Sequence, residues 1–102
     1  MTKRRVTTLK PMHPGEMLRE DVLPALGKTK TEIASLLGVS RQTLHDILSE
    51  KQPVTPMMAL RIGKLLGNGP DFWINLQRRF DLHVATQAIA GEIDKIPTLT
   101  AA

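Results

Sequence analysis

The sequence contains no cysteine, which excludes disulfide bonds and thiolate metal sites. Aromatic residues make up only 3% of the 102 residues. No apolar run approaches the roughly 20 residues that a membrane-spanning helix needs. The basic N-terminus is not followed by the hydrophobic stretch of a secretory signal. We therefore expect one small domain in the cytoplasm, with no membrane association.

The chain carries a net charge of +4, and this excess lies at one end. Residues 1–13 contain four basic residues and no acidic one, whereas the two kinds balance over the remainder. Residues 28–64 nevertheless hold six basic residues against three acidic ones, and such a local surface attracts polyanions. We expect residues 1–12 to form a flexible basic arm. An arm that binds nothing would carry the same charges, so charge alone does not show that the chain binds nucleic acid.

Signals for helix starts and ends recur along the chain, and no alternating pattern is long enough for a strand. Thr29 and Glu32 have the spacing of a capping box. The expected helices begin near Pro14, Lys30, Arg41, Pro56 and Pro70. Pro24 and Gly27 are expected to break the first helix. The others end at Gly38, Ser49 and Gly67, and between Phe80 and Ile89. The sequence therefore predicts an all-α domain over residues 13–90, followed by a tail over residues 91–102.

Residues 30–49 have the pattern of a helix-turn-helix. Only Gly38, Val39 and Ser40 join the two helices, so the helices are expected to cross steeply rather than fold back antiparallel. Ala34 is small enough to let them approach closely, and the apolar residues Leu44 and Ile47 follow the turn at the spacing of the motif. A generic pair of packed helices is the alternative, but it does not require this spacing.

A helix-turn-helix places the start of its second helix in the major groove of DNA. Arg pairs in a two-pronged manner with guanine, and Gln does so with adenine. We therefore predict that Arg41, Gln42 and His45 read bases. Six polar residues are predicted to contact the DNA backbone: Lys30, Thr31, Ser40, Thr43, Lys51 and Gln52. Asp46 would repel phosphate, so we expect it to orient a neighbouring basic side chain.

The three aromatic residues fall within nine residues of the last expected helix. Phe72, Leu76 and Phe80 form one stripe, and Trp73 lies beside it. We expect Phe72 and Leu76 to pack on the first and fourth helices as a lid over the core. The same helix and the residues after it are expected to form a homodimer, with two recognition helices one DNA turn apart.

The sequence offers no arrangement for metal binding or catalysis. The three histidines are far apart and have no carboxylate or thiol at ligand spacing, so we expect no metal and no cofactor. His13 is instead expected to fix the start of the first helix. A nucleophile elbow, a phosphate-binding glycine loop and a dinucleotide fingerprint are all missing, so we expect no enzyme.

Three further stretches resemble the HigA/VapI antitoxin family of the lambda-repressor-like (Xre) helix-turn-helix class. They read HPGEML over residues 13–18, VTPMMALRIGKLLG over residues 54–67 and DFWINLQRRFDL over residues 71–82. The resemblance implies a five-helix lambda-repressor-like domain in a cytoplasmic bacterial antitoxin. It also implies a homodimer that binds operator DNA, represses its own operon and neutralises a ribosome-associated mRNA endonuclease toxin of a type II pair. No toxin-contact residue is carried over.

Two alternatives remain open. A stand-alone Xre-type regulator without a toxin partner would have the same DNA chemistry, and the neighbouring gene distinguishes the two. A toxin pair predicts an adjacent reading frame for a small basic protein. A protein-binding module whose helix-turn-helix has lost its DNA contacts is the other alternative, and substituting Arg41 and Gln42 tests it.

Overall fold

The computed structural model describes residues 10–100, which form helices and turns without a strand. The predicted basic arm therefore lies almost entirely outside the described residues. The elements are α1 (Pro14–Met17), η1 (Leu18–Val22), α2 (Leu23–Leu26), α3 (Lys30–Leu37), α4 (Arg41–Leu48), α5 (Pro56–Leu66), α6 (Pro70–Ala88) and α7 (Ala90–Ile93). The all-α fold class is confirmed.

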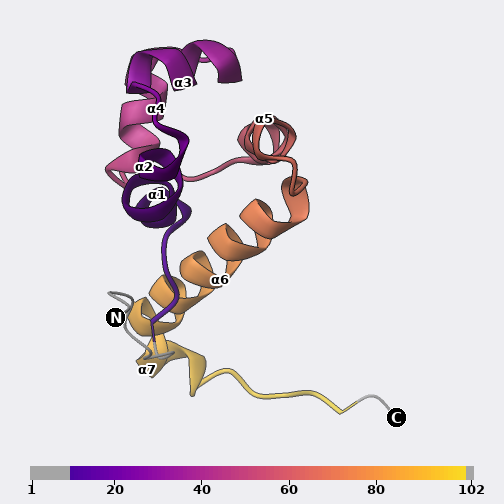
Figure 1. Ribbon diagram of the computed structural model, residues 1–102. Helices are drawn as coiled ribbons and strands as arrows, with labels where there is room; N and C mark the ends of the chain where they lie inside the picture. Colours follow the sequence, from indigo (N-terminus) through magenta and orange to yellow (C-terminus); the bar gives the residue numbers. More distant parts are fainter. Residues whose placement is uncertain (1–9, 101–102) are drawn as a thin grey trace, which may run out of the picture.

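The helices form a rounded part and an extension (Figure 1). The first helix, α3, α4 and α5 gather at one end, with α3 and α4 farthest from the C-terminus. The longest helix, α6, begins beside α5 and runs to α7 at the other end. Contacts between α5 and α6, and between α1 and α6, join the extension to the rounded part.

The first helix is continuous from Pro14 to Leu26 because α1, η1 and α2 follow one another without a break. The prediction that Pro24 ends this helix is wrong. Proline removes one backbone donor and crowds the carbonyl four residues earlier, which a regular α-helix does not tolerate. The chain widens into a π-helical turn just before it, where the Leu23 N–H donates to the Leu18 carbonyl. Gly27, in the left-handed conformation with φ 67°, ends the helix instead.

Side-chain caps start the next three helices, and the first of these caps is the predicted capping box. Thr29 and Glu32 form the capping box, with the Thr29 N–H 2.8 Å from Glu32 Oε1 and the Glu32 N–H 3.1 Å from Thr29 Oγ1. The backbone hydrogen bond from Thr29 lowers the pKa of Glu32. Ser40 caps α4 and Thr55 caps α5 by accepting from the N–H groups of Thr43 and Met58, and neither cap is a reciprocal capping box. Gly38, with φ 76°, makes the sharp turn between α3 and α4.

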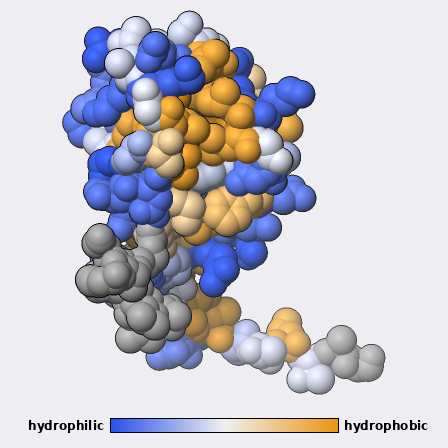
Figure 2. Space-filling view, in the orientation of Figure 1, coloured by the Kyte–Doolittle hydropathy of each residue, from blue (hydrophilic) through white to orange (hydrophobic). Residues whose placement is uncertain are grey.

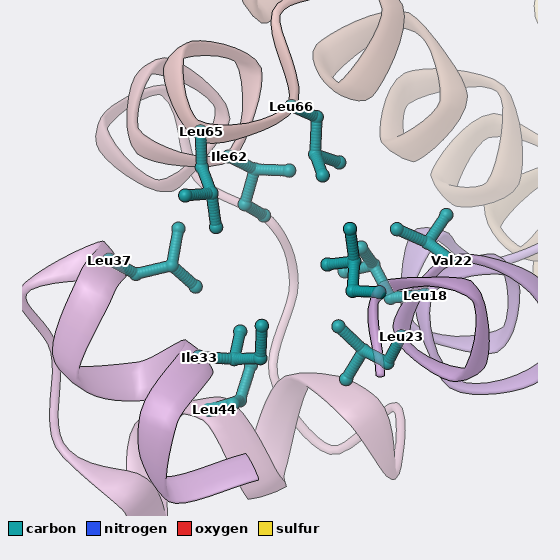
Figure 3. Close-up of a pocket in the computed structure, with 10 residues that line it drawn as sticks. Leu18, Val22, Leu23, Ile33, Leu37, Leu44, Ile62, Leu65 and Leu66 are labelled. Atoms are coloured by element: carbon teal, nitrogen blue, oxygen red, sulfur yellow. The ribbon is translucent and has the colours of Figure 1, made fainter. Parts of the chain in front are cut away.

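The core lies where the first helix, α3, α4 and α5 meet, with α6 against it. Its buried apolar residues are Leu18, Ile33, Ala34, Leu37, Leu44, Ile47, Leu48, Val54, Met58, Ala59, Ile62 and Trp73. Figure 3 shows side chains from four of these helices converging on a gap of about 10 Å³. The gap has no polar lining and is barely large enough for one water molecule, so we regard it as a packing defect rather than a ligand site.

One face of the rounded part is largely apolar at its surface. Figure 2 shows apolar residues gathered on its upper part, with hydrophilic residues along the edges. Leu36, Met57 and Leu60 are among the large apolar residues that stay exposed on α3 and α5.

The lid on the core is Trp73 rather than Phe72. Trp73 is 1% exposed, whereas Phe72 is 44% exposed and touches Trp73 only edge-on, so the prediction of a buried Phe72 is wrong. Leu76 packs against the core as predicted, although it is only partly buried. The buried stripe of α6 instead includes Gln77, whose Oε1 accepts from the Val54 N–H at 2.8 Å. Gln77 Nε2 donates to Asp81 Oδ1 at 2.9 Å, so the buried amide is hydrogen-bonded on both sides.

His13 caps the first helix, which confirms its predicted place. Its Nδ1 accepts from the Gly15 N–H at 2.8 Å. Its ring contacts the Phe80 ring of α6 edge-on, with the two ring centroids 4.9 Å apart. Burial lowers the pKa of His13, although the carboxylates of Glu50 and Asp81 act in the opposite direction. The cap requires a neutral ring because a doubly protonated imidazole has no acceptor.

We expect His13 to make folding stability depend on pH. The pKa of His13 is lower in the folded state than the ordinary histidine value of 6.5, so the unfolded chain takes up the proton first. The contribution is therefore complete above pH 6.5 and declines as the pH falls below it. Urea unfolding of the wild type and of His13→Asn at pH 7.5 and 5.5 measures this difference. Asn retains a capping oxygen without titrating, so an equal pH effect in both proteins would contradict the assignment.

Candidate nucleic-acid interface

The second helix of the helix-turn-helix, α4, has one buried side and one exposed side. Leu44, Ile47 and Leu48 are buried in the core. Arg41, Gln42 and His45 are exposed on the rest of the helix, together with Ser40 and Thr43. The predicted base-reading residues are thus brought together on one accessible face.

The N-terminus of α4 is organised by two hydroxyl groups. Ser40 Oγ accepts from the Thr43 N–H at 3.0 Å and donates to Thr43 Oγ1 at 2.9 Å. The positive end of a helix dipole and its free N–H groups favour a phosphate at this position. Both residues lie at this helix N-terminus, and their contact with the DNA backbone stays a prediction.

Gln42 and Asp46 lie one helical turn apart and are hydrogen-bonded. Gln42 Nε2 donates to Asp46 Oδ1 at 2.8 Å. The prediction that Asp46 orients a basic side chain is therefore wrong, since its partner is the uncharged amide of Gln42. Asp46 is half-buried, whereas Gln42 is exposed.

The other four residues that are predicted to contact the DNA backbone lie in two places, one at the start of α3 and one just after α4. Lys30 and Thr31 are exposed in the first turn of α3, and Lys51 and Gln52 are exposed just after α4. The N–H groups of Lys51 and Gln52 both donate to the Asp46 carbonyl, at 2.8 and 3.1 Å. This turn passes through Glu50, a non-glycine residue with φ 66°.

The first helix and α5 hold the motif by contacts that the sequence analysis did not identify. Gly15 touches α4 so closely that a Cβ atom there would overlap the Ile47 carbonyl. Arg19 Nη1 donates to the Leu48 carbonyl at 2.6 Å and lies 3.4 Å from Glu50 Oε2. Each contact joins residues about thirty positions apart, so no local pattern indicates it.

A second arginine stabilises the end of α3. Arg61 of α5 donates from Nη1 to the Leu37 carbonyl at 2.8 Å. It thereby satisfies one of the carbonyl groups that a helix leaves unpaired at its end. The two helices of the motif are thus each fixed at their C-terminal ends by an arginine from another helix.

Residues 10–100 contain neither a cluster of metal-binding side chains nor a helix that could cross a membrane. No group of three or more His, Asp or Glu residues in this range is arranged to hold a metal ion. Within the same range, no helix is both long enough and apolar enough to cross a membrane.

Comparison with known proteins identifies the family. The helix-turn-helix family model matches residues 18–73. An uncharacterized HTH-type transcriptional regulator of Haemophilus influenzae is 37% identical over 75 residues, covering 74% of this chain and 70% of the relative. Antitoxin HigA-1 of Vibrio cholerae is 35% identical over 78 residues, covering 76% of this chain and 73% of the relative. This chain belongs to the HigA family of helix-turn-helix proteins.

A solved HigA structure extends the likeness to the fold. The Pseudomonas aeruginosa antitoxin HigA with the higBA promoter is 34% identical and has a TM-score of 0.83. The match covers 89% of this chain and 100% of the Pseudomonas aeruginosa HigA chain. The residues matched by the family model run from η1 into the first turn of α6, so they contain the whole helix-turn-helix and the core that holds it. The family predicted from the three sequence stretches is confirmed.

Proposed function

We propose that this HigA-family protein is a DNA-binding antitoxin of a type II pair. It binds double-stranded operator DNA as a homodimer in the cytoplasm and represses its own operon. It also neutralises a cognate toxin, a ribosome-associated mRNA endonuclease. The observation that carries the DNA-binding half is the exposed face of α4, where Arg41, Gln42 and His45 lie beside a capped helix N-terminus.

The base-reading roles follow from the chemistry of these side chains. The Arg41 guanidinium matches the two acceptors of guanine in the major groove, and the Gln42 amide matches adenine. His45 lies one turn along the same helix. Lys30, Thr31, Ser40, Thr43, Lys51 and Gln52 surround this face and fix the position of α4 on the phosphates.

The homodimer follows from the geometry of a palindromic operator, which needs two recognition helices one DNA turn apart. Apolar side chains remain exposed towards the end of α6 and beyond it, including Leu82, Val84 and Ile89. An exposed apolar surface of this kind suits pairing with a second copy. We therefore place the dimer contact on α6 and the residues after it, with Phe80 as a candidate contributor.

The basic arm is expected to add affinity without sequence preference. Deleting residues 1–10 removes four basic residues and no acidic one. Fewer phosphate contacts release fewer counterions, so the slope of log K against log salt should flatten by up to about four charges. Fluorescence anisotropy with operator and random duplexes over a salt series measures both slopes. An unchanged slope would show that the arm does not contact DNA.

A stand-alone regulator remains the second candidate, because one relative is an uncharacterized HTH-type transcriptional regulator. Expressing the protein encoded by the adjacent reading frame, alone and together with this chain, separates the two. Growth arrest that this chain relieves, together with co-purification of the two proteins, supports the antitoxin. Normal growth in both cultures and no complex would leave only the regulator.

A further inference from the structure

We propose that Asp46 is a positioning residue that sets the base preference of Gln42. It does so by fixing which edge of the Gln42 amide faces the DNA. The inference rests on the proposed DNA-binding function and concerns how the α4 face distinguishes adenine from guanine. Asp46 itself need not touch a base.

The geometry fixes the orientation of the amide. Gln42 Nε2 donates to Asp46 Oδ1 at 2.8 Å, across one turn of α4. An ionised carboxylate only accepts hydrogen bonds, so the amide nitrogen and not the amide oxygen must face it. A free glutamine side chain has no such constraint and can present either end of its amide.

The hydrogen-bonding capacity that remains on Gln42 matches one base. The amide has two N–H donors and one carbonyl oxygen, and Asp46 takes one of the donors. One N–H and the oxygen are left. Adenine offers the complementary pair in the major groove, an acceptor at N7 and a donor at N6. Guanine offers two acceptors, N7 and O6. Pairing with both would need both N–H groups of the Gln42 amide, and Asp46 already takes one of them.

The location of Asp46 supports a role in recognition over a role in stability. Asp46 is half-buried, its partner is exposed, and the bond is an i, i+4 contact on a helix surface. Such contacts stabilise a helix only slightly. A carboxylate on a face that approaches phosphate also lowers DNA affinity by repulsion. A gain in specificity is therefore the benefit that the arrangement offers.

The test compares Asp46→Asn and Asp46→Ala with the wild type, each with and without Gln42→Ala. Asn can accept or donate, so it no longer fixes the amide, and Ala removes the contact. Binding is measured by competition with duplexes in which every base pair of the operator is changed in turn. The positions at which Gln42→Ala loses discrimination identify the base that Gln42 reads. Glu16→Gln, on the first helix and outside the helix-turn-helix, controls for the change of charge.

We expect both Asp46 variants to bind all duplexes more tightly while their preference for adenine over guanine at this position falls about tenfold. In the Gln42→Ala background the same substitutions should leave the preference unchanged. Two results would overturn the inference and leave DNA binding intact. One is an adenine preference in Asp46→Asn that stays within twofold of the wild type. The other is an equal fall in that preference when Asp46 is substituted in the Gln42→Ala background. Gln42→Ala with no effect at any position would overturn it as well. Equal binding of the wild type to operator and random duplexes would overturn the proposed function itself.

Discussion

Trp73→Ala is expected to destabilise the protein by about 3–5 kcal/mol, the range for removing a large buried aromatic side chain. Trp73 is 1% exposed and joins α6 to the core. Its Nε1 also donates to Asn68 Oδ1 at 3.1 Å, so the substitution removes a hydrogen bond and leaves a cavity. Single domains are stable by only about 5–15 kcal/mol, so a large part of the total would be lost. Urea unfolding of the two proteins measures the difference.

Phe72→Ala is the matched control for this experiment. Phe72 is the adjacent residue on the same helix and is also aromatic, but it is 44% exposed. We expect a loss of less than about 1 kcal/mol, as is usual for surface substitutions. An equal or larger loss from Phe72→Ala would contradict the placement of α6 on the core.

Substitution of both Arg41 and Gln42 by Ala is expected to weaken operator binding by at least about thirtyfold. Each base-reading contact contributes about 1–3 kcal/mol. The two predicted contacts are with guanine and with adenine, so we expect the two losses to add. Both side chains are exposed and have no bond to the core, so the fold should be retained. Binding to random DNA should fall much less, because only one charge is removed. Titration of a labelled operator duplex with each protein gives the two affinities.

Lys64→Ala provides the control for charge in this experiment. Lys64 is exposed on the last turn of α5, outside the helix-turn-helix. Its removal changes the net charge by the same amount and should leave the ratio of specific to random binding unchanged. Operator affinity that is equal in the double variant and the wild type would show that α4 does not read bases. It would favour a protein-binding module instead.

Most of the fold is predictable because its helix ends are encoded locally. The capping box at Thr29 and Glu32, the cap at Ser40 and the glycine at 38 all act within a few residues of where they occur. Pro24 misleads because local propensity forbids proline inside a helix, whereas the π-helical turn before it removes the conflict. No pattern in the sequence predicted that turn.

The choice between Phe72 and Trp73 depends on a contact that is distant in sequence. Neighbouring residues on a helix face about 100° apart, so two stripes compete for the core. The stripe with Phe72 is wholly apolar, whereas the stripe with Trp73 includes Gln77. A buried glutamine becomes acceptable only because the Val54 N–H and Asp81 satisfy its amide. Only the folded structure shows the first of these partners, which is 23 residues away.

The candidate site is predictable in its outline but not in its internal contacts. The exposure of Arg41, Gln42 and His45 follows from the apolar residues that face the other way. Asp46 also lies at a spacing that permits a bond to Gln42, but the sequence does not say which neighbour it takes. The arginines at positions 19 and 61 stabilise the motif through distant carbonyl groups, for which no sequence rule exists.

The most direct test of DNA recognition is binding of the purified protein to the DNA upstream of its own gene. The measurement is a titration against salt, with random DNA as competitor. We predict tight binding of a dimer that excess random DNA does not displace and that weakens as salt rises. Binding that random DNA displaces as readily as the operator itself would contradict the account, because the face of α4 would then carry charge but no base-reading function.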